Sequence, residues 1–428
     1  MTILVIGGGW SGLTAAVRLT QHGHSVQLLE SAKQLGGRAR SVDWQGLEID
    51  NGQHLLIGAY HRTLSLLSTL GANEQDLFQR RPLGIEIKDA DYSSIHLNAG
   101  RYLPWPLSLL WRLCRDNDLS IVSQIARLSL QAQRFNQKQD QSVADWLKAN
   151  NQSARLTRQL WEPLCLATLN TPLSTASAAV FATVLKDIFR RRRDSDLLIP
   201  IQPLGQTLPA YAERYIQTHG GQIRLQQRVK EIRIDKQRVS GVVTQQGEYI
   251  RAEHIIVATP LDISRQLLVS QLELPESATH PIATVYLQYA AQTRLTGPVI
   301  GLSGTLSQWV FDRHDLRPGL LSAVISGPGE HQAWDKQTVC NQVAAELEQL
   351  LPTITSRPTE SWLIREKKAT FSCTVDIQSH RPNNRTEITG LWLAGDYVAN
   401  PYPATLEGAV VNGEQTAMQL IEHLAAGR

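Results

Sequence analysis

Thr2–Gly12, TILVIGGGWSG, is the segment that most clearly indicates the fold class, because a short apolar run leads directly into a glycine-rich turn. Apolar residues then recur at helical spacing from Leu13 to Gln21, and a second apolar run, Ser25–Leu29, ends at Glu30. A strand, a glycine turn, a helix and a second strand in this order predict a βαβ unit. The chain is therefore expected to have an α/β fold that opens with a Rossmann-like unit.

The glycine turn has the spacing Gly7-x-Gly9-x-x-Gly12 and opens the expected helix. Gly7 allows a tight turn, Gly9 lets the backbone approach a pyrophosphate, and Gly12 lets the helix pack closely on the strand. The start of the helix offers free N–H groups and the positive end of its dipole to a phosphate. Glu30 is placed to accept hydrogen bonds from a ribose diol and disfavours the 2′-phosphate of NADP. The pattern predicts nucleotide binding, against the alternative of a structural turn without a ligand, with contacts from Gly7, Gly9, Trp10, Ser11, Gly12 and Glu30.

Two further segments near the N-terminus favour FAD as the nucleotide. Leu35–Ser41, LGGRARS, brings the backbone close to a ligand at Gly37, and Arg38 can neutralise a pyrophosphate. A solvated surface turn is the alternative for this segment. The stretch 46–54, GLEIDNGQH, places the small Gly52 and polar side chains where an extended flavin would continue.

The C-terminal region carries a matching pattern. Leu391–Asp396, LWLAGD, is an apolar strand ending in Gly395-Asp396, whose carboxylate can accept from ribityl hydroxyls. A helix beginning near Leu406 can direct its positive end at the flavin pyrimidine edge. The predicted contacts here are Gly395, Asp396, Thr405, Leu406 and Glu407. Because this pattern and the glycine turn lie at opposite ends of the chain, FAD explains them better than NAD. Only one glycine fingerprint is present, so NADPH or NADH is expected only as a transient electron donor, with another electron carrier as the alternative.

The order of the patterns predicts two interleaved parts. Residues 1–79, 204–260 and 385–428 are expected to form a discontinuous Rossmann-like FAD-binding domain. Residues 80–203 and 261–384 are expected to form an inserted α+β substrate-binding domain. Helical periodicity over Leu119–Phe135 and Val143–Leu169 makes 80–203 a largely helical subdomain.

Composition limits the classes of function. A net charge of +3 with 42% apolar residues fits a globular protein that does not bind nucleic acid. Four widely separated cysteines give no metal signature and no disulfide framework, so a cytoplasmic setting is expected. No apolar stretch reaches the ~20 residues of a membrane-spanning helix. Two segments rich in Leu, Trp and Arg, 101–114 and 189–201, predict a peripheral contact with the inner face of the cytoplasmic membrane, although a core stripe and a solvated charge run are the alternatives.

From end to end, the chain resembles the flavin amine oxidase and carotenoid desaturase superfamily. The resemblance rests on the glycine turn, Glu30, 36–41, 50–52, Arg228-Val229, 258–260, Gly395-Asp396 and 403–413. Within this superfamily, the stretch 160–172, LWEPLCLATLNTP, is similar to the squalene-associated hydroxysqualene dehydroxylases. The resemblance implies that Val229 contacts the adenine side of FAD. It also implies a hydrophobic isoprenoid substrate, hydroxysqualene, reduced to squalene with loss of water in hopanoid synthesis, and upstream enzymes of the squalene pathway as partners.

Several functional alternatives stay open from the sequence. His54, Glu162 and Tyr402 are candidates for the proton donor that the leaving hydroxyl needs, and none of them is assigned. An oxidative desaturase of carotenoid type would run electrons in the other direction. An amine oxidase would use two aromatic rings over the flavin, for which Tyr397 and Tyr402 are the candidates. A flavin-binding scaffold without catalysis is the non-enzymatic alternative.

Overall fold

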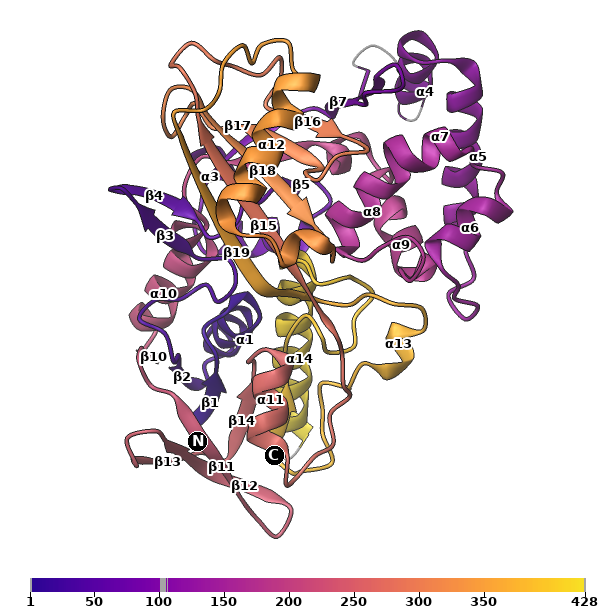
Figure 1. Ribbon diagram of the computed structural model, residues 1–428. Coiled ribbons are helices and arrows are strands. Elements are labelled where there is room, and N and C mark those ends of the chain that lie inside the picture. The colour runs from indigo at the N-terminus through magenta and orange to yellow at the C-terminus, as the bar shows by residue number, and fades with distance from the viewer. Residues whose placement is uncertain (1, 101–104, 106, 427–428) are drawn as a thin grey trace.

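The two largest sheets and a group of helices form the main parts of the computed structural model, which describes residues 2–100, 105 and 107–426. A parallel sheet lies in the lower half of Figure 1, and a larger sheet lies above it. The helices α4 to α9 gather beside the larger sheet, at the upper right. Both labelled chain ends lie in the lower half, next to the parallel sheet.

The parallel sheet has five strands in the order β10-β2-β1-β14-β20, namely Gln222–Arg224, Ser25–Leu29, Thr2–Ile6, His254–Val257 and Leu391–Leu393. Alternate residues of its central strand β1 face opposite sides. Ile3 and Val5 belong to the cluster that contains side chains of the helices α1 (Trp10–Gln21), α10 (Leu208–Thr218) and α14 (Leu406–Ala426). Leu4 belongs to the cluster that contains the small sheet β11-β12-β13 (Val229–Asp235, Arg238–Thr244 and Tyr249–Arg251). Covering on both faces explains why β1 is almost continuously apolar.

The predicted N-terminal unit is confirmed, with β1 and β2 at the expected residues. Helix α1 begins at Trp10, before the apolar periodicity starts, because Gly9 is its N-cap in an extended conformation. The α/β fold class is likewise confirmed.

The larger sheet has seven strands in the order β19-β15-β18-β17-β16-β7-β8, namely Glu360–Phe371, Thr279–Gln288, Leu320–Ser326, Trp309–Asp312, Val299–Leu302, Gly84–Lys88 and Ile95–Asn98. Helix α12 (Lys336–Leu350) packs on β15 and β19. Strands β7 and β8 come from the region whose composition indicates helices. They join this sheet because β7 pairs in parallel with β16, a long-range contact that local periodicity does not encode.

The helical group contains α4 (Leu107–Asp116), α5 (Leu119–Gln133), α6 (Val143–Ala149), α7 (Ala154–Leu156), the π-helical turn η1 (Thr157–Trp161), α8 (Glu162–Leu169) and α9 (Ala178–Ile188). The expectation of one helical stretch over Val143–Leu169 is wrong at residues 150–153. Asn151 has a positive φ of 53°, which ends the first helix. The Ser153 hydroxyl then accepts a hydrogen bond from the Leu156 N–H at 3.2 Å and starts the next helix.

The remaining elements connect these parts. They are the hairpin β3-β4 (Ser41–Trp44 and Leu47–Asp50), the sheet β5-β9-β6 (Leu56–Ile57, Leu197–Pro200 and Phe78–Arg81), the α-helices α2 (His61–Thr69), α3 (Glu74–Leu77), α11 (Leu261–Leu268) and α13 (Ile377–His380), and the short 3-10 turns at 192–195, 204–206 and 330–332.

Candidate active site

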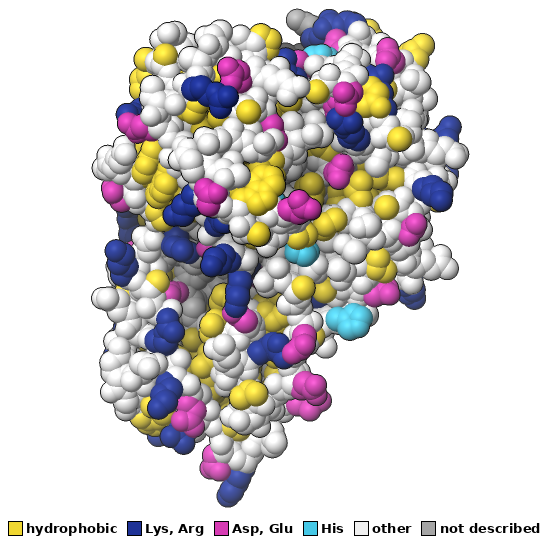
Figure 2. Space-filling view, viewed as in Figure 1, with side chains coloured by type: hydrophobic (Ala, Val, Ile, Leu, Met, Phe, Trp, Pro, Cys, Tyr) yellow, Lys and Arg dark blue, Asp and Glu magenta, His cyan; other side chains and the backbone are white. Residues whose placement is uncertain are grey.

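A single cavity of about 960 Å³ extends from the glycine turn after β1 to helices α8 and α9. Figure 2 shows this face of the molecule hollowed at mid-height, with Lys and Arg side chains gathered around the hollow. The cavity wall contains fourteen of the fifteen residues that the sequence predicts as cofactor contacts: Gly7, Gly9, Trp10, Ser11, Glu30, Gly37, Arg38, Gly52, Val229, Gly395, Asp396, Thr405, Leu406 and Glu407.

Gly12 is the exception, since it lies outside this wall of described residues. A Cβ atom on Gly12 would lie 2.1 Å from the Gly7 carbonyl oxygen, so glycine is needed there for the packing of α1 on the turn. Gly7 itself has a φ of 109°, and a Cβ atom there would lie 2.6 Å from the Ala258 carbonyl oxygen. The structure therefore gives Gly12 a packing role at the turn, as its place in the glycine pattern also suggests, and its contact with the ligand stays a prediction.

The turn forms a cradle in which a phosphate fits. Gly37 approaches Gly9 so closely that a Cβ atom on Gly37 would lie 3.1 Å from the Gly9 Cα. No described side chain caps the N-terminus of α1. The Ser11 hydroxyl and the Trp10 indole N–H are buried without a hydrogen-bond partner in the described part of the chain. Buried polar groups are rarely left unpaired, so these atoms and the free end of α1 match the phosphates of FAD.

Glu30 lies at the end of β2, on the cavity wall, and is held there by three hydrogen bonds. Its carboxylate accepts from the Gly8 N–H at 2.6 Å, from the Ala32 N–H at 2.7 Å and from the Ser31 hydroxyl at 3.1 Å. A carboxylate has about four acceptor sites, so these bonds orient Glu30 and leave capacity for a ribose hydroxyl. Val229 lines the neighbouring part of the wall, which suits the adenine side.

Arg38 and Asp396 pair with each other across the cavity wall, although the sequence assigned them to different parts of the ligand. The guanidinium lies 2.7 Å from the carboxylate and also donates to the Ala369 carbonyl at 2.8 Å. Burial alone would lower the pKa of Arg38, but the adjacent Asp396 carboxylate raises it above its ordinary value. The pair fixes the Arg38 guanidinium on the cavity wall next to Gly37, where the Asp396 carboxylate balances its charge.

Arg381 holds the loop that contains Asp396, and no motif in the sequence pointed to it. Its guanidinium donates to the carbonyl oxygens of Asn400 at 2.7 Å, of Tyr402 at 2.8 Å and of Asp396. Burial lowers the pKa of Arg381 to about 10. Arg381 thereby stabilises the backbone of residues 396–402, part of which lines the cavity.

The Glu407 carboxylate has a protein partner, where the sequence suggested a flavin contact. It accepts from the N–H groups of Arg62 at 2.8 Å and Thr63 at 2.9 Å, and from the Thr63 hydroxyl at 2.7 Å. These N–H groups lie in the first turn of α2, so Glu407 fixes the start of α14 against the start of α2. Burial raises the pKa of Glu407. Thr405 and Leu406, just before it, line the cavity at the N-terminal end of α14.

The three proton-donor candidates differ in their surroundings. His54 lines the cavity, and its Nδ1 is buried without a hydrogen-bond partner among the described residues. Burial lowers the pKa of His54, while the nearby Asp50 carboxylate opposes that shift. Tyr402 also lines the cavity, but its hydroxyl donates to Asp187 at 2.9 Å. Glu162 is exposed and is not part of the described cavity wall. Of the three candidates, His54 is thus the one that lines the cavity and has a buried ring nitrogen without a partner in the described part of the chain.

The end of the cavity away from the glycine turn is apolar. Its wall is formed mainly by side chains of β7, β8, α8, α9 and β17, including Ile85, Leu97, Leu164, Val184, Ile188 and Phe311. Asn170 closes α8 in a left-handed conformation with φ 50°. Its side chain accepts from the Gly327 N–H at 2.6 Å and donates to the Thr370 hydroxyl at 2.9 Å, which ties α8 to the large sheet. The stretch 160–172 therefore shapes the apolar wall.

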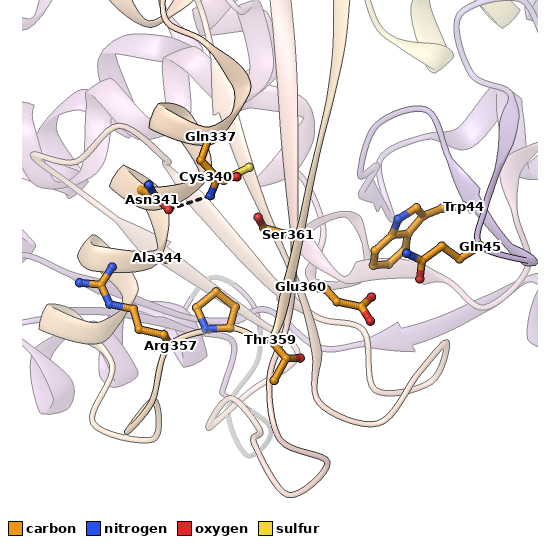
Figure 3. A pocket seen from close by; sticks show the side chains of 11 residues that line it. Trp44, Gln45, Gln337, Cys340, Asn341, Ala344, Arg357, Thr359, Glu360 and Ser361 are labelled. Atoms are coloured by element: carbon orange, nitrogen blue, oxygen red, sulfur yellow. Dashed lines mark hydrogen bonds between the residues drawn. The ribbon is translucent and has the colours of Figure 1, made fainter.

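A second hollow of about 670 Å³ lies beside α12 and β19 (Figure 3). Its side chains are mainly polar, and two of them, Gln337 and Asn341, hydrogen-bond to each other at 2.9 Å. It contains none of the predicted contact residues, so the chemistry is assigned to the larger cavity.

Comparison with known proteins agrees with this site. The model of the family described as flavin containing amine oxidoreductase matches residues 10–421. The chain is 26% identical to a hydroxysqualene dehydroxylase of Zymomonas mobilis, over 98% of this chain and 99% of that protein. It is 28% identical to a hydroxysqualene dehydroxylase of Rhodopseudomonas palustris, over 100% and 99% of the two chains.

More distant similarities share the same architecture. A 15-cis-phytoene desaturase of an Oncidium hybrid is 22% identical over 99% of this chain and 78% of its own. The solved structure of an oxidoreductase from Methanosarcina mazei superposes with a TM-score of 0.76 at 16% identity, covering 99% of this chain and 100% of the other. At this identity the structural likeness shows the fold.

Proposed function

We propose that this chain, which belongs to the family of flavin-containing amine oxidoreductases and is an FAD-dependent oxidoreductase, reduces hydroxysqualene to squalene. The observation that carries the proposal is one continuous cavity with a phosphate cradle at one end and an apolar wall at the other. Two relatives that match over almost their whole length carry the name of this activity. The place of the reaction in triterpenoid or hopanoid precursor synthesis is part of the proposal.

The reaction requires one hydride, which carries two electrons, and one further proton. The carbon–oxygen bond of the allylic alcohol breaks, a carbon–hydrogen bond forms with a hydride that reduced FAD supplies when bound, and the hydroxyl leaves as water after taking up a proton. The apolar wall excludes bulk water from the reacting carbon and holds the long hydrocarbon chain in one orientation.

His54 is the side chain that we assign to the proton transfer. It lines the cavity, and its buried Nδ1 has no hydrogen-bond partner among the residues that the structure describes, whereas the hydroxyl of Tyr402 is already bonded to Asp187. Burial lowers the pKa of His54, and the nearby Asp50 carboxylate opposes that shift and so favours the protonated imidazole, which is the form that can donate. Asp50 is itself fixed, because it accepts from the Leu204 N–H at 2.7 Å.

The surroundings of Tyr397 argue against amine oxidation. An aromatic pair over the flavin would need both Tyr397 and Tyr402 at the cavity. Tyr397 is buried, its hydroxyl donates to Ser264 at 2.9 Å, and it is not among the described residues of the cavity wall. The electron donor that reduces the flavin is proposed to be NADPH or NADH in transient contact, with another electron carrier as the alternative.

The test is a product analysis with the purified holoprotein. Under anaerobic conditions with chemically reduced flavin, we expect hydroxysqualene to be converted to squalene, while the same protein with oxidised flavin forms none. Absence of squalene from correctly folded, flavin-loaded and reduced protein would overturn the proposal. Desaturated products from phytoene with oxidised flavin would identify the desaturase instead, and hydrogen peroxide released on addition of amines would identify an amine oxidase.

A further inference from the structure

The outward face of α4 is apolar. Leu107, Leu110 and Trp111 are 56%, 43% and 45% exposed, and their spacing places them on one side of the helix. Leu113, on the other side, is buried, and Leu119 at the start of α5 adds an apolar side chain that is 72% exposed. A surface helix normally turns polar side chains outward, so this face indicates contact with an apolar environment.

Arginines surround this apolar face. The guanidinium groups of Arg112 and Arg115 lie 5.4 and 5.3 Å from the ring centroid of Trp111. Arg190 and Arg191, which follow the C-terminus of α9, are exposed and form no ion pair with a described residue. The acidic groups beside α4 are already paired, because Asp116 binds Arg115 at 2.8 Å and Asp118 lies 3.4 Å from Arg155.

These two groups of side chains are joined in space. The indole N–H of Trp105, just before α4, donates to the carbonyl oxygen of Phe189, just after α9, at 3.0 Å. We call the combined area the α4 surface, and it consists of Leu107, Leu110, Trp111, Arg112, Arg115, Leu119, Arg190 and Arg191.

The α4 surface lies over the apolar end of the active-site cavity. Ile188 and Phe189, at the end of α9, line the cavity. Helix α4 packs on β8, and Leu97 of β8 lines the cavity from that side. The elements that carry or support the α4 surface, α9 and β8, therefore also contribute apolar side chains to the cavity wall.

We propose that the α4 surface docks on an anionic phospholipid bilayer, so that the isoprenoid substrate passes from the lipid into the apolar end of the cavity. Trp and Leu side chains that enter the headgroup region, flanked by arginines, are typical of an interfacial helix. An arginine close to an anionic surface strengthens binding about fivefold. The identity of the lipid substrate rests on the proposed function, whereas the docking rests on this surface alone.

Only part of the two segments predicted to contact the membrane, 101–114 and 189–201, belongs to the α4 surface. Residues 101–104 and 106 lie outside the described part of the chain. Leu197, Leu198 and Ile199 are buried in β9 between β5 and β6, so they are corrected from membrane contacts to core residues. Over residues 2–100, 105 and 107–426, no helix combines the length and apolarity needed to span a bilayer.

Vesicle flotation of the purified holoprotein tests the docking. We expect binding to vesicles of phosphatidylglycerol and phosphatidylcholine and much weaker binding to phosphatidylcholine alone. The double variant Arg190→Glu and Arg191→Glu should weaken binding at least about 25-fold, from about fivefold for each charge. The double variant Leu110→Ser and Trp111→Ser should weaken it at least about tenfold, because it removes the apolar part of the contact.

Matched controls come from the opposite end of the molecule. Arg251 on β13 and Val269 after α11 are both exposed, and these elements lie at the lower end of Figure 1, far from α4. Arg251→Glu and Val269→Ser should leave vesicle binding unchanged. Thermal denaturation of every variant shows that it is folded.

The outcomes separate docking from catalysis. If the α4-surface variants lose turnover of hydroxysqualene in vesicles but keep turnover of detergent-solubilised hydroxysqualene, the docking is supported. Vesicle binding without any squalene formation supports the docking and refutes the proposed function. Squalene formation without vesicle binding overturns the docking. Vesicle binding that is insensitive to the α4-surface variants, or a dimer in solution that these variants dissociate in place of vesicle binding, also overturns it.

Discussion

The variant Gly9→Ala should weaken the binding of FAD while leaving the stability of the apoprotein almost unchanged. Gly9 has φ −75° and ψ 175°, an extended conformation that alanine adopts without strain. The nearest atom to a Cβ on Gly9 is the Gly37 Cα at 4.0 Å, which is ordinary van der Waals contact. Lower entropy of the unfolded chain stabilises such a variant by about 0.4–1 kcal/mol, and a poorer N-cap costs a similar amount. The free energy of unfolding of the apoprotein should therefore change by less than about 1 kcal/mol.

The affinity for FAD should change much more. The added methyl group lies in the cradle and keeps the pyrophosphate away from the N–H groups of α1. Losing two hydrogen bonds to a charged group, at about 1.5 kcal/mol each, gives about 3 kcal/mol. This corresponds to an increase of about 100-fold in the dissociation constant. Titration of the apoprotein with FAD measures the affinity, and urea denaturation of the same sample measures stability.

Variants of two other glycines serve as comparisons for Gly9→Ala. Gly297→Ala is the matched control, because its Cβ would lie 3.9 Å from the Val299 carbonyl oxygen and Gly297 is not part of the described cavity wall, so FAD binding should not change. Gly12→Ala should destabilise the protein, because its Cβ would lie 2.1 Å from the Gly7 carbonyl oxygen. If Gly9→Ala binds FAD as tightly as the unaltered protein, the pyrophosphate does not lie in this cradle and the reasoning is refuted.

Three other residues give further tests. His54→Asn should lower single-turnover squalene formation about 100-fold or more, as expected for loss of a general acid, while Tyr402→Phe should retain most of the rate. Because burial lowers the pKa of His54, the rate of squalene formation should rise as the pH falls and level off only below the ordinary pKa of 6.5. The same dependence of the rate on pH in His54→Asn would contradict the assignment. Glu407→Ala should lower the free energy of unfolding by about 3 kcal/mol in urea denaturation, because two N–H groups at the start of α2 lose their acceptor, and an unchanged midpoint would refute that role. Asn170→Ala and Asn170→Gly both lose the hydrogen bonds of the side chain, but only alanine is strained at φ 50°. The free energy of unfolding of Asn170→Ala should therefore be lower than that of Asn170→Gly by about 1–2 kcal/mol. Equal stabilities of the two variants would contradict this.

The local features of the cofactor region could be predicted from the sequence. The glycine spacing, Glu30 and Gly395-Asp396 depend on short-range rules of turn geometry, and the structure brings them to one wall although hundreds of residues separate them. The glycine pattern predicts where the cofactor binds, because few residues other than glycine adopt the backbone conformation of this turn. Boundaries between the FAD-binding and substrate-binding parts stay a prediction.

Long-range partners could not be predicted in this way. The Glu407 carboxylate binds α2, and Arg381 binds three carbonyl groups of a loop, through contacts that leave no periodicity in the sequence. The strands β7 and β8 were missed because β7 joins the sheet through β16, more than two hundred residues away, and β8 joins it through β7. Asn151 interrupted a helical pattern because its backbone conformation, and not its hydrophobicity, ends α6.

A single anaerobic turnover shows whether reduced flavin and hydroxysqualene react with each other in this cavity. The flavin of the holoprotein is reduced in deuterated water and the protein is mixed with one equivalent of hydroxysqualene. The structure predicts that flavin reoxidation and squalene formation proceed at the same rate and to the same extent, with one deuterium in each squalene. Flavin that stays reduced while hydroxysqualene is recovered unchanged would contradict the proposal that this cavity brings the two together.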